Sequence, residues 1–489
     1  MISPEVKEFA HVISSHLKGK LYLVGGAVRD MFIGIPPKDF DFELFHVWPT
    51  ELVNFLDKNK IPYKFNSDAK FPVYRVKIVE KMISGDYIDN WIEIGFPRKD
   101  NKVGPKHSDF ECIIDPFMTL TEAAFRRDFT INAGYYDVLE EKYHHLGYLN
   151  DIKTNTLKEV HSEKFKEDSL RILRGFQFVS RFNLTNYNTV CHWILTSNPM
   201  MDELFNIDPS GIYAEFCKGI TKANNIGHAL DYLGYLAYGG CLFFDVINQM
   251  IHCDQNTKHH SEGNVWPHTK NVIKNAIELA DKSNEQEKIL LFWAAFFHDI
   301  GKMKTYALKD GQPTAYGHNM ESDDLVEHYG ARYGIPKKMI KQIIVLKHHH
   351  MIGNGAKNRK LFEIAEELNS VGLTFETLCK LMLADTYGSI KQTFWSTTRA
   401  HGETYAFIER LKALNIYQRK ADMFVNGTDI EHISSGEIKG KCLGDLLKEM
   451  KVLQYAGSIK SRNEALDFLQ RRCLNILEKR KEKVVDTKS

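Results

Sequence analysis

Two aspartates separated by one residue, Asp39 and Asp41, are the side chains best suited to chemistry in this sequence. Alternate residues of a strand point to one face, so a strand over residues 39–44 would present both carboxylates together. Paired carboxylates suit hard divalent cations such as Mg²⁺, and a metal pair supports in-line phosphoryl or nucleotidyl transfer. A surface strand with two solvated acids would produce the same pattern.

A glycine turn lies just before these aspartates. Residues 21–24 are a short apolar run, which predicts a buried strand. Gly25 and Gly26 follow it, with Arg29 close behind. Glycines permit a tight turn and leave backbone amides open to an anion. The turn and Arg29 therefore favour a site where a metal and a phosphate meet.

Adjacent arginines mark a second cluster, Arg126 and Arg127, followed by Asp128 and Asn132. Two neighbouring guanidinium groups can bind triphosphate oxygens in a bidentate manner. On a helix, Asp128 and Asn132 would share one face and hold a ribose or fix an arginine. An exposed charged edge at a helix start is the alternative.

A third cluster contains Asp168, Arg171 and Arg174. On a helix, Asp168 and Arg171 are neighbours, and an ordinary helical ion pair would explain them. They also suit base selection, because cytosine and adenine both present an amine donor beside a ring-nitrogen acceptor. Guanine and uracil present the reverse order and would leave buried groups unpaired, at about 1–3 kcal/mol each.

These motifs, in this order, resemble the class II tRNA nucleotidyltransferases, the CCA-adding enzymes of the DNA polymerase β superfamily. The resemblance implies that Asp39 and Asp41 are catalytic and bind Mg²⁺, and that Asp168 and Arg171 act as the template for C and A. It also matches residues 97–110, a polar stretch expected to be a mobile loop, to a loop that CC-only enzymes lack. The expected nucleotide-binding residues are Gly26, Arg29, Arg127, Asp128, Asn132, Asp168, Arg171 and Arg174.

Two positions depart from that family pattern. Gln177 stands where the family often has arginine, and Ser210-Gly211 stands where it has a Glu-Arg pair. Both positions lie in the expected neck, and both bear on how the enzyme implied by the resemblance changes from adding C to adding A. Glu93, on an expected strand, is either a third carboxylate of the metal site or a plain exposed strand residue.

A separate histidine-rich segment offers a second metal site. Adjacent His298 and Asp299 can both reach one cation, and His268 and Asp385 would complete the set. This set, with Gly317-His318 further on, resembles the HD phosphohydrolase superfamily. The resemblance implies a divalent cation such as Ni²⁺, Mn²⁺ or Mg²⁺ and hydrolysis of phosphoesters, including 2′,3′-cyclic phosphates. The run of three histidines at 348–350 is within range but is less expected to provide ligands.

Bulk composition indicates an ordinary globular protein of several domains. The chain has 489 residues and a net charge of +1, so any nucleic-acid surface must be local. Its eight cysteines contain no C-x-x-C pair, which favours a reducing cytoplasm. No apolar run reaches the roughly 18 residues of a membrane span, so no membrane association is expected.

The predicted fold class is α+β: an α/β head with a mixed or antiparallel sheet, followed by an all-α neck, body and tail. Strands are expected at residues 73–79 and 91–96 and a capped helix at 119–125. Strand patterns vanish after about residue 160, where helical spacing takes over. The expected domains are a nucleotidyltransferase head (1–160), a helical neck for nucleotide selection and RNA binding (161–250), an HD domain (251–400) and a helical tail (401–489).

The leading functional hypothesis is addition of C, C and A to tRNA from CTP and ATP, by a monomer or homodimer. The tail resembles that of class II enzymes, where it supports binding of the tRNA elbow. An A-adding enzyme or a poly(A) polymerase is the alternative within the class. An HD phosphohydrolase with a regulatory head, or a non-catalytic RNA-binding protein, is the alternative of another class.

Overall fold

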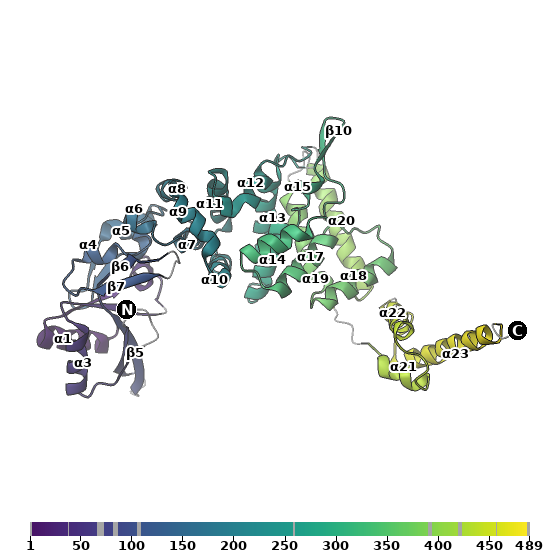
Figure 1. Cartoon of the computed structure of the whole chain (residues 1–489), viewed down its shortest axis with the longest axis horizontal. Helices are drawn as coiled ribbons and strands as arrows, with labels where there is room; N and C mark the ends of the chain where they lie inside the picture. The colour runs from purple at the N-terminus through teal and green to yellow at the C-terminus, as the bar shows by residue number, and fades with distance from the viewer. Residues whose placement is uncertain are drawn as a thin grey trace. The chain divides into compact units, whose positions relative to one another are not determined.

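The computed structural model describes residues 2–37, 39–65, 73–81, 87–104, 109–257, 260–389, 394–418, 423–455 and 457–486. The chain divides into two compact units, Met1–Asn248 and Gln249–Ser489. The first unit carries the large sheet, and the second is almost entirely helical (Figure 1). A mixed sheet followed by helices confirms the α+β prediction.

A seven-stranded sheet forms the base of the first unit, with strand order β3-β4-β5-β2-β1-β8-β9. Every neighbouring pair is antiparallel except β2 and β5, which run parallel. The strands expected at residues 21–24, 73–79 and 91–96 are confirmed. The strands are β1 (Lys20–Val24), β2 (Asp41–Phe45), β3 (Tyr63–Phe65), β4 (Tyr74–Lys81), β5 (Tyr87–Gly95), β8 (Tyr135–Asp137) and β9 (Lys142–His144).

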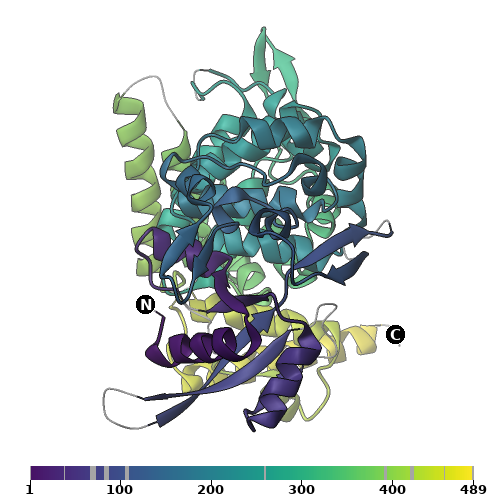
Figure 2. The same cartoon turned by 90° about the vertical axis from the view of Figure 1, so that its left-hand side faces the viewer.

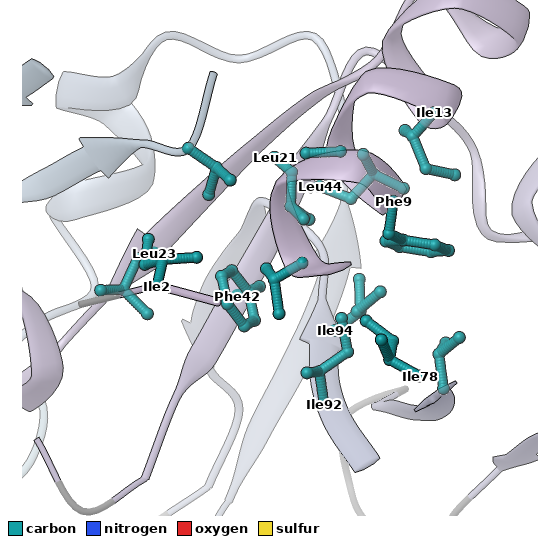
Figure 3. Close-up of a cluster of buried hydrophobic side chains, with 14 of the residues drawn as sticks. Ile2, Phe9, Ile13, Leu21, Leu23, Phe42, Leu44, Ile78, Ile92 and Ile94 are labelled. Atoms are coloured by element: carbon teal, nitrogen blue, oxygen red, sulfur yellow. The ribbon is translucent and has the colours of Figure 1, made fainter. Parts of the chain in front are cut away.

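Helix α1 (Pro4–Leu17) covers one face of this sheet, against β1 and β4 (Figure 2). It begins at Ser3, whose hydroxyl accepts from the Val6 backbone N–H at 3.3 Å. Its buried residues recur at three- and four-residue spacing, as one apolar face requires. Figure 3 shows the core that this face joins: Phe9 and Ile13 from the helix, with Leu21, Leu23, Phe42, Leu44, Ile78, Ile92 and Ile94 from the strands.

The polar stretch at residues 97–110 differs from the expected mobile loop. Its first part is a strand, β6 (Arg98–Lys102), paired antiparallel with β7 (Phe110–Ile114). Residues 105–108 lie outside the described part of the chain. The capped helix is confirmed as α4 (Leu120–Ala124), since Thr119 and Glu122 exchange both bonds of a capping box.

Helix α7 (Leu170–Phe182) is the centre of the helical part of the first unit and packs against α10 (Pro209–Thr221) and α11 (Ile226–Tyr238). Gly219 permits the approach of α10, because a Cβ there would lie 2.4 Å from Phe176. The other helices are α2 (Gly26–Phe32), α3 (Pro49–Lys58), α5 (Leu146–Lys153), α6 (Ser162–Phe165), α8 (Asn188–Leu195) and α9 (Asn198–Glu203), with short 3₁₀ turns η1 (Thr130–Asn132), η2 (Leu204–Asn206) and η3 (Leu242–Phe244).

The second unit is built on α13 (Val265–Leu279), α14 (Glu285–Phe297), α17 (Lys337–His349) and α19 (Phe375–Gly388), which lie side by side (Figure 1). The expectation that strands end near residue 160 is wrong in one place, since β10 (Ala307–Lys309) and β11 (Gln312–Thr314) form a hairpin. The other helices of the second unit are α15 (Lys302–Thr305), α16 (Asp323–Arg332), α18 (Asn358–Ser370), α20 (Phe394–Ala413), α21 (Gly427–Ile433), α22 (Lys441–Tyr455) and α23 (Arg462–Asp486). Helix α12 (Asp245–Ile251) begins in the first unit and ends in the second.

Within the described residues, no single helix combines the length and apolarity needed to cross a bilayer. The two helical segments Ile226–Tyr238 and Leu242–Ile251 reach the required length and apolarity only when they are counted together, and the chain bends by 117° between them.

Candidate active site and metal centre

Strand β2 carries acidic residues on one face. It begins at Asp41, so Asp39 precedes the strand, and the expected strand over 39–44 is two residues too long at its start. Asp41 is in register with Glu93 on parallel strand β5. Partial desolvation and the negative charges of Glu93 and Asp39 raise the pKa of Asp41. Carboxylates that repel one another in this way fit a divalent cation with oxygen ligands, such as Mg²⁺.

Glu43, the next residue on that face of β2, is buried and binds two arginines. Its Oε1 accepts from Arg127 Nη2 at 2.9 Å and also from Arg126. The Glu43 side chain is only 4% exposed, so both guanidinium groups are held by a carboxylate that water hardly reaches. Sequence reasoning missed Glu43, although the alternation of Asp39, Asp41 and Glu43 was a visible signal.

A hydrogen-bonded chain links four predicted residues across three elements. Asp128 Oδ2 accepts from Arg174 Nε at 2.5 Å, and Asp128 Oδ1 accepts from Asn132 Nδ2 at 3.2 Å. Asn132 Oδ1 in turn accepts from Arg29 Nη1 on α2. Burial alone would raise the pKa of Asp128, but Arg174 and Arg171 lower it overall. A buried carboxylate kept ionised in this way orients the Arg174 guanidinium.

The expected helical spacing of Asp128 and Asn132 is wrong. Residues 126–128 lie in a turn and bend, Phe129 forms an isolated bridge with Glu159, and Asn132 belongs to the 3₁₀ turn η1. The two side chains still meet, because the tight 3₁₀ turn brings Asn132 back toward Asp128, as a turn of α-helix would.

Asp168 and Arg171 are also arranged differently from an ordinary helical pair. Helix α7 begins at Leu170, so Asp168 lies before it and accepts from the Leu170 backbone N–H at 3.1 Å. Arg171 Nη1 and Nη2 donate to the backbone carbonyls of Lys164 and Arg126, at 2.8 and 2.7 Å. Arg171 Nε is 3.8 Å from Asp168 Oδ2, beyond hydrogen-bond distance. The backbone, more than Asp168, fixes this guanidinium.

All eight residues predicted to bind nucleotide line one pocket of about 520 Å³. The glycine turn forms part of its wall, and Gly25 has a φ of 69°, in the region that favours glycine. Gln177 and two lysines missed by sequence reasoning, Lys218 and Lys222, line it too. Their four-residue spacing near the end of α10 was the available signal.

The predicted ligands of the second site come together in the second unit. We call His268, His298, Asp299 and Asp385 the HD metal site. His268 Nε2 lies 3.0 Å from Asp385 Oδ1 and 3.3 Å from His298 Nε2, and His298 Nε2 lies 3.2 Å from Asp299 Oδ2. Atoms that each lie ~2.1 Å from one cation are roughly 3–3.5 Å apart, so this spacing fits a metal.

The surroundings of the HD metal site also suit a cation. His298 Nδ1 is bonded to the Ala295 carbonyl at 2.7 Å, which directs Nε2 to the centre. Burial alone would lower the pKa of His268, but Asp385 and Glu262 raise it to about 9. The centre therefore has a strongly negative potential, which attracts a cation. Of the three histidines at 348–350, His350 faces Asp299, whereas His348 and His349 contact Asp323 and Glu367.

Comparisons with known proteins find matches in both units of the chain. The family model described as the poly(A) polymerase head domain matches residues 21–158, and that of the HD domain matches residues 265–384. The chain is 29% identical over 306 residues to a multifunctional CCA protein of Actinobacillus pleuropneumoniae serotype 5b (strain L20), covering 62% of this chain and 68% of the relative. It is 27% identical over 336 residues to the multifunctional CCA protein of Haemophilus ducreyi, covering 68% and 75%.

Solved structures share the fold. The Bacillus stearothermophilus CCA-adding enzyme in complex with CTP aligns with a TM-score of 0.58 and 19% identity, over 98% of this chain and 100% of that one. The Thermotoga maritima CCA-adding enzyme complexed with tRNA aligns with a TM-score of 0.53 and 15% identity, over 96% of each chain.

Proposed function

We propose that this chain, which is a CCA-adding nucleotidyltransferase with an HD domain, adds C, C and A to the 3′ end of tRNA from CTP and ATP. One observation carries the proposal. A single pocket is lined by the glycine turn, by the arginines proposed to bind phosphate and by the two residues proposed to select the base. We place the metal carboxylates at the adjoining end of β2.

In the proposed reaction, the tRNA 3′-hydroxyl attacks the α-phosphate, a new P–O bond forms, the hydroxyl loses its proton and pyrophosphate leaves. Mg²⁺ bound by Asp39 and Asp41 would lower the pKa of the hydroxyl and neutralise the leaving group. Arg29, Arg127 and Arg174 bind the triphosphate in the same orientation for every cycle, because Asn132, Glu43 and Asp128 hold them.

Base selection is assigned to Asp168 and Arg171. Asp168 would accept from the exocyclic amine of cytosine or adenine, and Arg171 would donate to the ring nitrogen. Arg171 is held by two backbone carbonyls, so a small change in the preceding segment moves the guanidinium without breaking an ion pair. That arrangement suits a template that serves two bases of different size.

The test is incorporation by the purified chain on tRNA that lacks its three terminal nucleotides, with each nucleoside triphosphate alone and in pairs. A CCA-adding enzyme adds C from CTP alone and completes the end only with CTP and ATP. Addition of A alone to this substrate would favour a poly(A) polymerase, and addition of A only to tRNA that already ends in CC would favour an A-adding enzyme. No incorporation at all, with phosphohydrolase activity retained, would favour a regulatory head.

The HD metal site supports a second activity, metal-dependent hydrolysis of phosphoesters such as 2′,3′-cyclic nucleotides. It lies at a pocket of about 500 Å³ that Asp299, Asp385 and Lys302 help to line. Lys302 is buried with its ammonium 2.6 Å from Asp299 Oδ2, where it also offers positive charge to a phosphate. Hydrolysis of 2′,3′-cAMP with Ni²⁺, Mn²⁺ or Mg²⁺ tests this activity, and its absence with all three would refute it.

The four-part division into head, neck, HD domain and tail is retained as part of the proposal. The head and the neck together build the nucleotide pocket, and the tail is assigned to the tRNA elbow. We place the reaction in the cytoplasm.

A further inference from the structure

Gln177 brings an unpaired amide oxygen to the nucleotide pocket of the first unit. The residue is only 6% exposed and lines the pocket of about 520 Å³. Among the described residues, its Oε1 is buried and has no hydrogen-bond partner. A buried acceptor that stays unpaired costs free energy, so this oxygen calls for a donor that arrives with a ligand.

The packing of two helices sets the position of Gln177 in the pocket wall. Gln177 lies on α7, and α10 packs so closely beside it that a Cβ added at Gly219 would lie 3.3 Å from Gln177 Cα. Ser180, about one turn further along α7, donates from Oγ to the Gly219 carbonyl at 2.7 Å. These contacts hold α7 and α10 together beside Gln177, so its amide belongs to a rigid part of the wall.

Two other acceptor side chains of the pocket are already engaged by arginines. Among the described residues that line the pocket, the side chains with acceptor oxygens are Asp128, Asn132, Asp168 and Gln177. Asp128 Oδ2 accepts from Arg174 Nε at 2.5 Å. Asn132 Oδ1 accepts from Arg29 Nη1. Both side chains therefore fix an arginine, and a ribose in this pocket needs another acceptor.

An incoming nucleoside triphosphate has few donors to offer Gln177. The ionised triphosphate oxygens only accept, and the amine of the base is assigned to Asp168, so the ribose hydroxyls remain. Gln177 follows the base-reading Arg171 by six residues on α7, or ~9 Å along the helix axis, which suits a group beyond the base. We propose that Gln177 Oε1 accepts from a ribose hydroxyl of the incoming nucleotide and thereby selects ribonucleotides. The inference rests on the proposed function, because it takes this pocket as the nucleotide site.

The departure from the family pattern at position 177 gains a chemical meaning from this role. Arginine, which often stands there, carries five N–H donors and no acceptor, whereas the glutamine amide carries both a donor and an acceptor. The described wall of the pocket already contains five arginines. Gln177 adds the acceptor that a hydroxyl requires and that a further guanidinium could not supply.

The test measures kcat/KM for addition of A to tRNA that ends in CC, with ATP, 2′-deoxy-ATP and 3′-deoxy-ATP. The unchanged full-length protein should prefer ATP over one of the two analogues by about 5- to 150-fold, as one unpaired buried acceptor implies. Q177L removes the amide at similar volume and should reduce that preference at least about fivefold, with the preference over the other analogue unchanged. S180A is the matched control, because it removes the bond to the Gly219 carbonyl on the same helix and Ser180 is not among the described pocket-lining residues. It should keep both preferences.

An equal loss of kcat/KM for all three nucleotides in Q177L, or no loss at all, would overturn the ribose contact. The same drop in preference in S180A would also overturn it, because loosened helix packing would then be the cause. Equal use of ATP and both analogues by the unchanged protein would refute the contact without any variant, so the test holds even if Q177L fails to fold. These outcomes leave the proposed function standing, whereas no addition of A by the unchanged protein would overturn both.

Discussion

Replacing Asp128 by Asn tests whether the buried hydrogen-bonded chain positions the nucleotide site. Asp128 is 7% exposed, and it accepts from Arg174 at 2.5 Å, from the Phe129 N–H at 2.7 Å and from Asn132 at 3.2 Å. Asparagine keeps the shape but offers one acceptor oxygen, so an N–H donor faces another donor in either amide orientation. The negative charge between Arg174 and Arg171 is also lost.

The size of the effect follows from these contacts. A hydrogen bond to a charged group contributes about 1.5–3 kcal/mol. If that loss reaches the triphosphate through the loosened Arg174, the KM for CTP and for ATP rises roughly 10- to 100-fold, at about 1.4 kcal/mol per tenfold. Because Asp128 lies outside the proposed metal carboxylates, kcat should change less than KM.

Single-nucleotide incorporation on tRNA provides the measurement, with KM and kcat determined separately for CTP and ATP. D151N is the matched control, since Asp151 accepts from Thr130 Oγ1 at 2.6 Å in η1 and is not among the described pocket-lining residues. KM values for D128N within twofold of D151N would refute the positioning role. A loss of kcat in D128N as large as the expected rise in KM, with KM itself unchanged, would also refute the positioning role.

Three further predictions concern the proposed sites and their electrostatics. D41A should abolish incorporation of both CTP and ATP while thermal unfolding stays near that of the unchanged protein; near-normal incorporation would exclude Asp41 as a metal ligand. R171A should relax base choice, measured as misincorporation of GTP and UTP relative to CTP, and unaltered selectivity would contradict the template model. Because the folded state lowers the pKa of Asp128, its carboxylate stabilises the protein above about pH 4 and this contribution disappears as the pH falls through the lowered pKa. The urea midpoint of the unchanged protein should therefore exceed that of D128N at pH 7 and approach it under acid conditions, and a constant difference at all pH values would show that ionisation of Asp128 is not the cause.

The parts of the site that depend on local spacing could be predicted from the sequence. The apolar run before Gly25 predicts β1 and its turn, because a buried strand and a glycine turn depend on neighbouring residues. Thr119 and Glu122 predict the start of α4 for the same reason. The eight residues expected to bind nucleotide line one pocket.

The parts that depend on contacts between distant segments could not be predicted. Glu43 meets Arg126 and Arg127 only because β2 and the turn after α4 are brought together by the fold. His318 and His350 come to face Asp299 from segments on either side of α16 and α17. Pairing of this kind depends on the topology of the chain, and one sequence without its relatives contains no direct measure of it.

The walls of the nucleotide pocket have a consequence for how the protein is made. Gly26, Arg29 and Arg127 are translated first, whereas Arg174 and Lys218 follow in α7 and α10. A nascent chain that has emerged only to residue 160 carries the proposed metal carboxylates, but it lacks the two residues proposed to select the base and four of the seven Arg and Lys residues that line the pocket. Because domains fold as they emerge from the ribosome, the head can reach its fold before it can hold a nucleotide in place. Selective addition then becomes available only when the helical neck has been synthesised.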